Sequence, residues 1–309
     1  MQDEKRPILV TGAHRSGTTW VGKMIAASPS IGYVHEPFNP VIPRPGICGA
    51  KFRGFTYVCE KNETDYYEHI RRTCTFTYNV MGALGTVRSW RHLTRILKEY
   101  AIFADYRRQG ARPLLKDPIA VFSAEWLASR FAMSVVVLIR HPAAFVSSIK
   151  QLNWEHSFSE FLEQRLLMDD HLKPFEAEIR EYAAARHDII EQAALIWKLI
   201  YHVVRKYRDR HPEWSFVRHE DLSLDPAGQF QELFGRLHLE YSEEIARTIQ
   251  QHSDRGNPAE AAAGTLHMLK RDSKSSIHNW KNRLTAAEIG RIRELVEDVS
   301  SVYYSNDDW

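Results

Sequence analysis

The sequence has 309 residues, of which 44% are hydrophobic and 26% are charged, and these proportions exclude a disordered or fibrous chain. Lysine and arginine total 41 against 39 aspartates and glutamates, so the formal net charge is only +2. Proteins that hold long nucleic acids through their overall charge are usually far more basic. We therefore expect no nucleic-acid partner, and we expect any bound anion to be held locally by particular residues.

Short apolar runs alternate with helical patterns along the chain. The expected strands are residues 8–11, 31–34, 114–115, 135–139 and 215–217. The expected helices are residues 18–27, 90–108, 123–130, 143–150, 189–210 and 229–237, and a capping box of Thr285 and Glu288 begins a last helix. Strands that are separated by helices predict an α/β fold with a central parallel sheet flanked by helices.

The domain organisation follows from what lies between these elements. No linker rich in glycine, serine or proline divides the chain, so we expect a single domain over residues 1–309. The least regular part begins at Pro37, where prolines, glycines and aromatic residues are scattered without a clear period. A long irregular segment inside an α/β domain is usually functional, and residues 37–110 are therefore predicted to be a functional insertion.

Cysteines and apolar runs indicate the environment of the protein. Cys48, Cys59 and Cys74 match no zinc-binding spacing, so we expect reduced thiols, with a Cys59–Cys74 disulfide as the alternative in an exported protein. The apolar stretch near the N-terminus ends at Gly12 and is too short for a signal peptide or a membrane anchor. No transmembrane segment is predicted, and we expect a soluble cytoplasmic protein.

The strongest motif lies directly after the first expected strand. Gly12 and Gly17 have the spacing of a phosphate-binding loop, in which backbone N–H groups bind an anion at the start of the next helix. Thr18 stands where nucleoside triphosphatases have a lysine, and the nearest cation is Arg15. This pattern predicts a phosphate site, and an ordinary turn between a strand and a helix is the alternative.

A second cation follows the most apolar strand. Arg140 stands directly after residues 135–139, and Ser148 follows eight residues later. Nucleoside triphosphatases use a carboxylate on a neighbouring strand to hold Mg²⁺, so an arginine there favours a second phosphate over a metal. Asp117, after residues 114–115, is the counter-indication, because it could be a metal-holding carboxylate.

Together these segments resemble sulfotransferases that use 3′-phosphoadenosine 5′-phosphosulfate (PAPS). The loop of Arg15, Ser16, Gly17, Thr18 and Thr19, followed by Trp20, looks like their 5′-phosphosulfate loop. Arg140 with Ser148 resembles their 3′-phosphate motif, and residues 216–226 are similar to their recurrent Tyr-Glu-Asp-Leu segment. Lys116, Asp117 and Pro118 resemble an element of the tyrosylprotein and carbohydrate types. The resemblance spans residues 8 to about 284 and implies a P-loop-containing nucleotide-binding fold.

The resemblance also implies how the donor is bound. Backbone amides of the loop and the hydroxyls of Thr18 and Thr19 would hold the 5′-phosphate and the sulfonate, and Arg15 would offset their charge. The donor-binding residues are thus expected to be Arg15, Ser16, Gly17, Thr18, Thr19, Arg140, Ser148, Lys270 and Arg271. The last two lie where family members close a basic loop over the 3′-phosphate, and a solvated run of charges is the alternative for them.

Catalysis is expected to rest on Glu36, Lys116 and Arg15. Lys116 would stabilise the negative charge that develops as the sulfonate leaves, and PAP would be the product. Cytosolic small-molecule members carry a histidine two residues after their equivalent lysine, where this chain has Pro118. Glu36 lies where tyrosylprotein and carbohydrate-type enzymes place a catalytic glutamate, so it is the predicted base. The alternatives are a structural Glu36 in a salt bridge, or His35 or His14 as the base. No metal is expected, since a sulfonate carries less charge than a terminal phosphate.

The acceptor is expected to be a hydroxyl of a small molecule or glycan, with a carbohydrate or glycoconjugate favoured. Residues 52–106 mix aromatic side chains with arginines, which suits a sugar ring or an anionic glycan. Aromatic packing in the core and a solvated basic helix face are the alternative. Residues 37–110 would then be the acceptor-binding insertion. A P-loop kinase that uses ATP and Mg²⁺ and a non-catalytic nucleotide-binding protein stay open as other functions, and the oligomeric state is not predicted.

Overall fold

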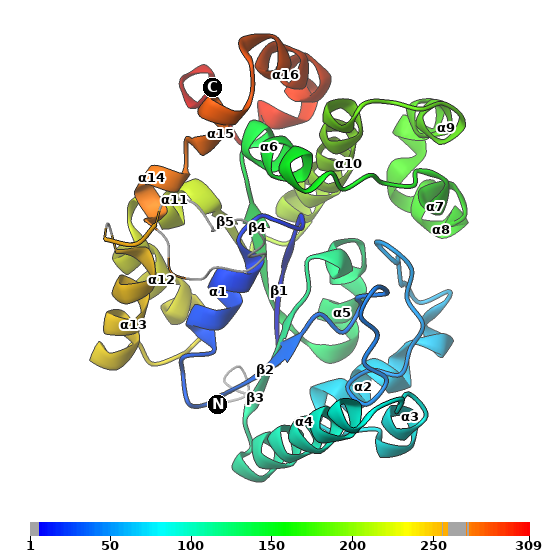
Figure 1. Cartoon of the computed structure of the whole chain (residues 1–309), viewed down its shortest axis with the longest axis vertical. Coiled ribbons are helices and arrows are strands. Elements are labelled where there is room, and N and C mark those ends of the chain that lie inside the picture. Colours follow the sequence, from blue (N-terminus) through cyan, green and yellow to red (C-terminus); the bar gives the residue numbers. More distant parts are fainter. Residues whose placement is uncertain (1–5, 255, 259–269, 271) are drawn as a thin grey trace.

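Five parallel strands lie at the centre of the computed structural model, which describes residues 6–254, 256–258, 270 and 272–309 (Figure 1). They are β1 (Ile8–Gly12), β2 (Ile31–His35), β3 (Arg112–Lys116), β4 (Ser134–Ile139) and β5 (Ser215–Arg218). Their order across the sheet is β2-β3-β1-β4-β5, and every neighbouring pair is parallel. All five expected strands are confirmed, each slightly longer than predicted.

The expected helices are confirmed as well. They are α1 (Thr18–Ile25), α4 (Trp90–Gln109), α5 (Ala124–Phe131), α6 (Pro142–Leu152), α10 (Ile189–Arg210), α12 (Pro226–Arg236) and α16 (Ala286–Ser300). The capping box of Thr285 and Glu288 is present at the start of α16. Further helices are α2 (Tyr67–Cys74), α3 (Val80–Leu84), α7 (Ser159–Leu162), α8 (Arg165–Leu167), α9 (Glu176–Ala184), α11 (His219–Leu224), α13 (Glu243–Ser253), α14 (Ser273–Ser276) and α15 (Asn279–Arg283).

Helices cover both faces of the sheet because the strands are apolar on both sides. Ile8 and Val10 belong to a core that α1, α12 and α13 complete. Leu9 belongs to the opposite core, which contains buried residues of α5, α6 and α10. Successive residues of a strand point to opposite faces, so a continuous apolar run serves both cores. Figure 1 shows α1, α12 and α13 on one side of the strands and α5 and α10 on the other.

The strand order creates a crevice at the carboxyl edge of the sheet. β2 and β3 lie on one side of β1, whereas β4 and β5 lie on the other. Ligands of open α/β sheets bind beyond the carboxyl ends of the strands, where the chain connections diverge in this way. The segments that leave β1, β2 and β4 at this edge carry Arg15, Glu36 and Arg140, and Lys116 is the last residue of β3.

The connection between β2 and β3 holds α2, α3 and α4, and its aromatic residues pack mainly against one another. The rings of Phe38 and Phe52 stack with centroids 4.1 Å apart. Phe103 of α4 contacts Phe76 and Tyr78, with ring centroids 5.6 and 5.7 Å away. For these residues the structure favours the core-packing alternative over a sugar-binding role.

Two further expectations concern the cysteines and the membrane. Cys48, Cys59 and Cys74 are all free thiols, so no Cys59–Cys74 disulfide is present. Within the described ranges, no helix has both the length and the apolar character that crossing a membrane requires.

Candidate active site

The loop between β1 and α1 has a backbone that requires glycine at two positions. Gly12 and Gly17 have φ angles of 135° and 90°, which L side chains rarely adopt. A Cβ at Gly12 would collide with the carbonyl oxygen of Leu138, and one at Gly17 would lie 2.6 Å from Nδ1 of His219. Gly17 is the N-cap of α1 and has no side chain that could accept from the first N–H groups of the helix. These donors are therefore left for an anionic ligand.

Tyr201 of α10 holds this loop to the end of β4. Its hydroxyl lies 3.0 Å from Oγ of Ser16 and donates to the Leu138 carbonyl at 3.1 Å. The backbone N–H of Arg140 donates to the same hydroxyl at 3.2 Å, and the Trp197 indole donates to the Arg140 carbonyl at 2.9 Å. Burial raises the pKa of Tyr201, which keeps it neutral and able to donate. One helix thus fixes the two segments that were predicted to bind anions relative to each other.

The predicted donor cations and serine lie together, although they come from distant parts of the sequence. Nε of Arg15 donates to Oγ of Ser148 at 3.0 Å, and the Arg140 guanidinium donates to the Arg15 carbonyl oxygen. Arg15 has a φ of 64°, in the left-handed region that residues with a Cβ seldom occupy. Such outliers gather at functional sites, where the surrounding structure holds them.

Lys116 and Glu36 form an ion pair at the carboxyl ends of β3 and β2. The Lys116 side chain is 0% exposed, and its Nζ donates to Oε1 of Glu36. Oε2 of Glu36 accepts from Nδ2 of Asn39 at 2.8 Å, and the Glu36 N–H donates to the Lys116 carbonyl at 2.8 Å. Glu36 also has a left-handed backbone, with a φ of 47°. The stem of Lys116 packs so closely on α1 that a Cβ at Gly22 would lie 2.9 Å from its Cγ.

The electrostatics of this pair keep the carboxylate ionised. Burial by itself would raise the pKa of Glu36, but the charge of Lys116 and its hydrogen bond outweigh burial and lower that pKa. Burial lowers the pKa of Lys116, and the charge of Glu36 opposes this. Glu36 is therefore an anion at neutral pH, the protonation state that a general base needs.

Asp117 is a buried structural carboxyl. Its Oδ2 accepts from the Phe38 N–H at 2.6 Å and its Oδ1 from the Ile119 N–H at 3.0 Å. Burial raises its pKa to about 7. No group of three or more His, Cys, Asp or Glu side chains in the described part of the chain has an arrangement that could hold a metal ion. Asp117 thus fastens the β2–β3 connection to β3.

A cleft of about 670 Å³ contains most of these groups. The half in which the donor is predicted to bind, called the donor half below, is lined by Arg15, Gly17, Thr18, Thr19 and Arg140. Glu36 lies on its wall, beside a second half lined by His35, Asn39, Phe55, Trp154 and His156. Of the aromatic residues and arginines that residues 52–106 offered for acceptor binding, only Phe55 reaches the cleft lining.

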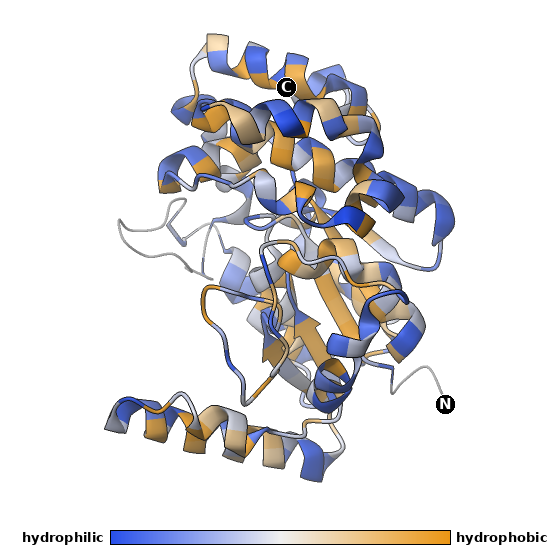
Figure 2. Cartoon of the chain, turned by 90° about the vertical axis from the view of Figure 1, so that its right-hand side faces the viewer, coloured by the Kyte–Doolittle hydropathy of each residue, from blue (hydrophilic) through white to orange (hydrophobic). Residues whose placement is uncertain are grey.

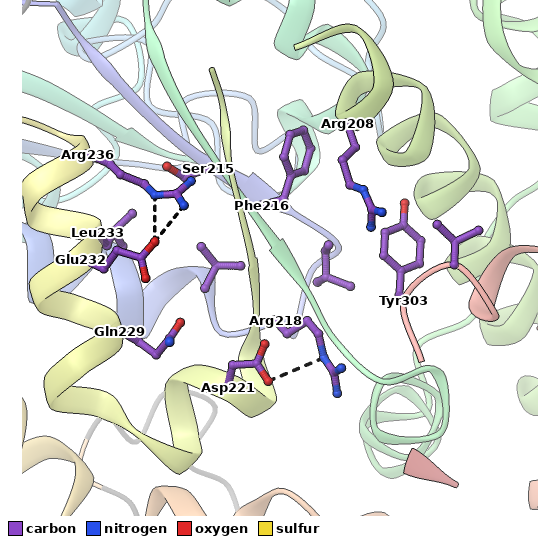
Figure 3. Close-up of a pocket in the computed structure, with 13 residues that line it drawn as sticks. Arg208, Ser215, Phe216, Arg218, Asp221, Gln229, Glu232, Leu233, Arg236 and Tyr303 are labelled. Atoms are coloured by element: carbon purple, nitrogen blue, oxygen red, sulfur yellow. Dashed lines mark hydrogen bonds and ion pairs between the residues drawn. The ribbon is translucent and has the colours of Figure 1, made fainter. Parts of the chain in front are cut away.

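A smaller cavity of about 350 Å³ lies beside β5, and its lining includes Phe216, Arg218 and Asp221 of the segment 216–226 (Figure 3). Arg236 pairs with Glu232 at 2.8 Å, and Arg218 lies 3.8 Å from Asp221. None of the predicted site residues lines this cavity. The larger cleft is therefore the candidate active site.

Sequence reasoning missed several cleft residues. Ser273, Ser276, Asn279 and Arg283 reach the cleft from the C-terminal segment, and His219 and Ser223 reach it from α11. The predicted Lys270 is exposed, and Arg271 lies outside the described residues. The nearest signal in the sequence was the segment 216–226, in which Glu220 accepts from the His141 N–H at 2.9 Å and supports the turn after β4.

The two alternative bases differ in their surroundings. His35 lies 3.9 Å from Oε1 of Glu36, and its Nδ1 lies 3.2 Å from the Tyr33 hydroxyl. His14 lines the cleft, and burial together with nearby His156 and Arg15 lowers its pKa well below the ordinary value. Both histidines are thus close to the site.

Comparison with known proteins agrees with the geometry. A sequence profile of the sulfotransferase family matches residues 7–243, and the chain belongs to this family. Among similar solved structures, the sulfotransferase domain from the curacin biosynthetic pathway has a TM-score of 0.48 at 14% identity, covering 94% of this chain and 97% of that one. The sulfotransferase domain of the Synechococcus PCC 7002 olefin synthase has a TM-score of 0.47 at 16% identity, covering 97% and 96%. A mouse sulfotransferase complexed with PAP has a TM-score of 0.44 at 12% identity, covering 98% and 86%. No curated protein matches the chain significantly.

The protein is therefore a sulfotransferase enzyme with a P-loop-type α/β fold. Members of this family generally take the sulfonate from PAPS and release PAP. The predicted fold class and family are confirmed.

Proposed function

We propose that the enzyme transfers the sulfonate of PAPS to an acceptor hydroxyl, with Glu36 as the general base. The observation that carries this proposal is the ion pair between Glu36, which lines the cleft, and Lys116, which is fully buried beside it. A carboxylate kept ionised beside a buried ammonium offers both a proton acceptor and a group that stabilises developing negative charge.

The donor half supports binding of a bisphosphate nucleotide. The first N–H groups of α1 and the hydroxyls of Thr18 and Thr19 would hold the 5′-phosphate and sulfonate. Gly17 leaves no room for a side chain beside His219, and the uncapped N–H groups that follow it suit a phosphate group. Arg140 and Ser148 would bind the 3′-phosphate that distinguishes this donor from ATP, and Arg15 bridges the two segments.

In the transfer step the acceptor oxygen forms a bond to sulfur while the bond from sulfur to the 5′-phosphate oxygen breaks. The hydroxyl proton passes to the Glu36 carboxylate, and the charge left on the phosphate is stabilised by Lys116 and Arg15. A positioned base typically contributes about 10²–10⁴-fold to the rate. An electrostatic group such as Lys116 contributes about 10²–10³-fold.

A carbohydrate or glycoconjugate hydroxyl is the acceptor we propose. The exposed Trp154 ring and Phe55 offer aromatic faces, and Asn39, His35 and Glu155 offer polar groups along the same half of the cleft. Aromatic faces with a few hydrogen-bonding groups suit a sugar ring. We also propose one working domain over residues 1–309, with residues 37–110 as its acceptor-binding insertion, because the cleft collects residues from His14 to Arg283.

Nucleotide binding tests the donor assignment directly. Thermal unfolding is measured with adenosine 3′,5′-bisphosphate and, separately, with ATP plus Mg²⁺. At about 100 times its Kd, the bisphosphate is expected to add about 2.7 kcal/mol of stability, a shift of several degrees. Stabilisation by ATP with Mg²⁺ alone would favour a kinase and overturn the proposal.

The acceptor is tested by a screen with a labelled sulfate donor. Saccharides are expected to be sulfated, with phenols as the comparison class. Turnover of phenols without any saccharide would refute the carbohydrate assignment and leave the donor assignment standing.

A further inference from the structure

Exposed apolar side chains gather in one short stretch of the chain. Of the thirteen large hydrophobic residues that are exposed among the described residues, eight lie between residues 80 and 102. The most exposed are Met81 at 79%, Trp90 at 75% and Leu97 at 58%. Scattered apolar residues on a surface are ordinary, whereas a contiguous cluster marks an interaction site.

The same stretch carries an excess of positive charge. Residues 80–110 contain six lysines and arginines against two acidic residues, a net charge of +4. The whole chain has a net charge of +2, so the remaining residues together carry −2. The basic residues are Arg88, Arg91, Arg95, Lys98, Arg107 and Arg108.

The helical period of α4 arranges these residues in adjacent stripes. Trp90 and Leu97 are seven residues apart and therefore lie on one stripe of the helix, with Ala101 continuing it. Arg91 and Lys98 have the same spacing and lie on a neighbouring stripe, about 100° further round. Figure 2 shows hydrophobic and hydrophilic residues alternating along α4, at the lower end of the molecule.

The inner side of α4 already serves the fold. Ile96 and Phe103 are buried, and Phe103 contacts Phe76 and Tyr78. Tyr78 donates to Oε2 of Glu99 at 2.9 Å, and Nε of Arg95 lies 3.9 Å from Oε1 of the same carboxylate, so the charge of Arg95 is partly offset. The outer stripes are thus spare surface, with apolar and cationic groups side by side.

We propose that the α3–α4 surface, defined by Met81, Leu84, Val87, Trp90, Leu97 and the cations Arg88, Arg91, Arg95 and Lys98, binds an anionic lipid membrane. A helix with an apolar stripe and flanking cations lies in the plane of a membrane interface. The apolar side chains enter the boundary between headgroups and acyl chains, and arginine and lysine stems reach back to the lipid phosphates. Tryptophan favours this boundary.

Charge argues for lipid rather than a second copy of the chain. Two copies that met through this surface would bring a charge of +4 against +4, whereas an anionic headgroup layer is complementary to it. The proposed contact lies in the plane of the membrane interface.

The test is co-sedimentation with vesicles, which needs no assumption about the enzyme's activity. The full-length protein is mixed with vesicles of phosphatidylcholine alone or of phosphatidylcholine with 30% phosphatidylglycerol. We expect binding to the anionic vesicles only, and we expect it to weaken at 0.5 M salt because the charges are then screened. Equal binding to both vesicles, or to neither, would overturn the proposal.

Two double variants separate the apolar and the cationic contributions. Arg91→Gln with Lys98→Gln is expected to lower the partition coefficient about 30-fold, since each cation near an anionic surface contributes about fivefold. Trp90→Ser with Leu97→Ser is expected to lower it at least tenfold. The matched control is Arg165→Gln with Leu224→Ser, which are exposed on other elements and are expected to change nothing.

Stabilisation by adenosine 3′,5′-bisphosphate shows that each variant is folded, because all the substituted residues lie outside the donor half of the cleft. If Trp90→Ser with Leu97→Ser instead converts a dimer into a monomer in sedimentation velocity, and vesicles are not bound, the surface is an interface between copies. If the variants bind anionic vesicles as the parent does, another part of the chain binds lipid. Either result refutes the proposal.

Discussion

The two halves of the cleft differ in the groups that line them and in how far these groups are exposed. The donor half consists of backbone groups and of buried or half-buried side chains, with its loop held by Tyr201 and its strand end held by Trp197. The acceptor half is formed by side chains of connecting segments, and some are largely exposed, such as Val41 at 84%. A buried, hydrogen-bonded half tolerates little change, whereas exposed side chains change at small cost to folding. One scaffold is thus able to keep its donor while its acceptor varies.

Glu36 belongs to both halves, and replacing it has the largest expected effect. Glu36→Gln keeps the shape of the side chain but removes the proton acceptor, so turnover is expected to fall about 10²–10⁴-fold. Binding of adenosine 3′,5′-bisphosphate, measured by calorimetry, is expected to change little. Glu288→Gln is the control, because it breaks a comparable lysine pair with Lys150 away from the cleft. Full turnover in Glu36→Gln would make His35 or His14 the base.

In the donor half, Arg140→Gln is expected to weaken binding selectively. A hydrogen bond to a charged group contributes about 1.5–3 kcal/mol, so affinity for adenosine 3′,5′-bisphosphate is expected to fall roughly 10- to 150-fold. Affinity for adenosine 5′-phosphate is expected to stay nearly constant, because that nucleotide lacks the 3′-phosphate. Calorimetry with both nucleotides measures this, and Arg165→Gln is the exposed control. Equal losses for both would mean that Arg140 acts only by supporting the loop.

In the acceptor half, Trp154→Ala is expected to have a smaller effect. An aromatic face contributes about 0.5–1.5 kcal/mol beyond the area it buries, so kcat/KM for a saccharide is expected to fall about 2- to 13-fold. The KM for the donor is expected to stay the same. Trp90→Ala serves as the control, because Trp90 is an exposed tryptophan that does not line the cleft. A change in the KM for the donor alone would show that Trp154 contributes to the donor half and would contradict its assignment to the acceptor half.

Asp117 is expected to affect stability rather than turnover, and its effect appears in the pH dependence of unfolding. Its pKa is about 7 in the folded protein, above the ordinary value of 3.8, so the folded state keeps a proton that the unfolded state has lost. Between about pH 4 and 7 the free energy of unfolding is therefore expected to fall as pH rises, by up to about 1.4 kcal/mol per unit. Urea unfolding at several pH values measures this slope. Asp117→Asn is expected to reduce it, whereas Asp209→Asn at an exposed site is expected to leave it unchanged.

The contrast between the donor half and the acceptor half also explains which features the sequence could predict. Continuous apolar runs such as residues 135–139 and the long pattern of α10 fix their elements locally, so the strands and main helices follow from the sequence. The phosphate loop is predictable because glycine at positions 12 and 17 has a local conformational cause. The short helices α2 and α3 have too few turns to show a period.

The residues that hold the phosphate loop in place, such as Tyr201, and the residues of the acceptor half could not be predicted from local sequence patterns. Tyr201 looks like one more core residue of an amphipathic helix, and only the fold brings its hydroxyl to Ser16, 185 positions away in the sequence. Trp154 and His156 follow α6 in a segment without a motif, and Arg283 reaches the cleft from the far end of the chain. Pairings of this kind are tertiary, and their sequence separation leaves no local pattern.

The ion pair between Lys116 and Glu36 has a kinetic consequence. In the proposed mechanism Lys116 interacts with both the Glu36 carboxylate and the phosphosulfate, so we expect donor binding to weaken its hydrogen bond to Glu36. Before the donor binds, the Glu36 carboxylate accepts a hydrogen bond from Lys116, and an acceptor that enters first would meet a carboxylate that is already hydrogen-bonded. We therefore expect ordered binding, in which the nucleotide binds before the acceptor in productive turnover.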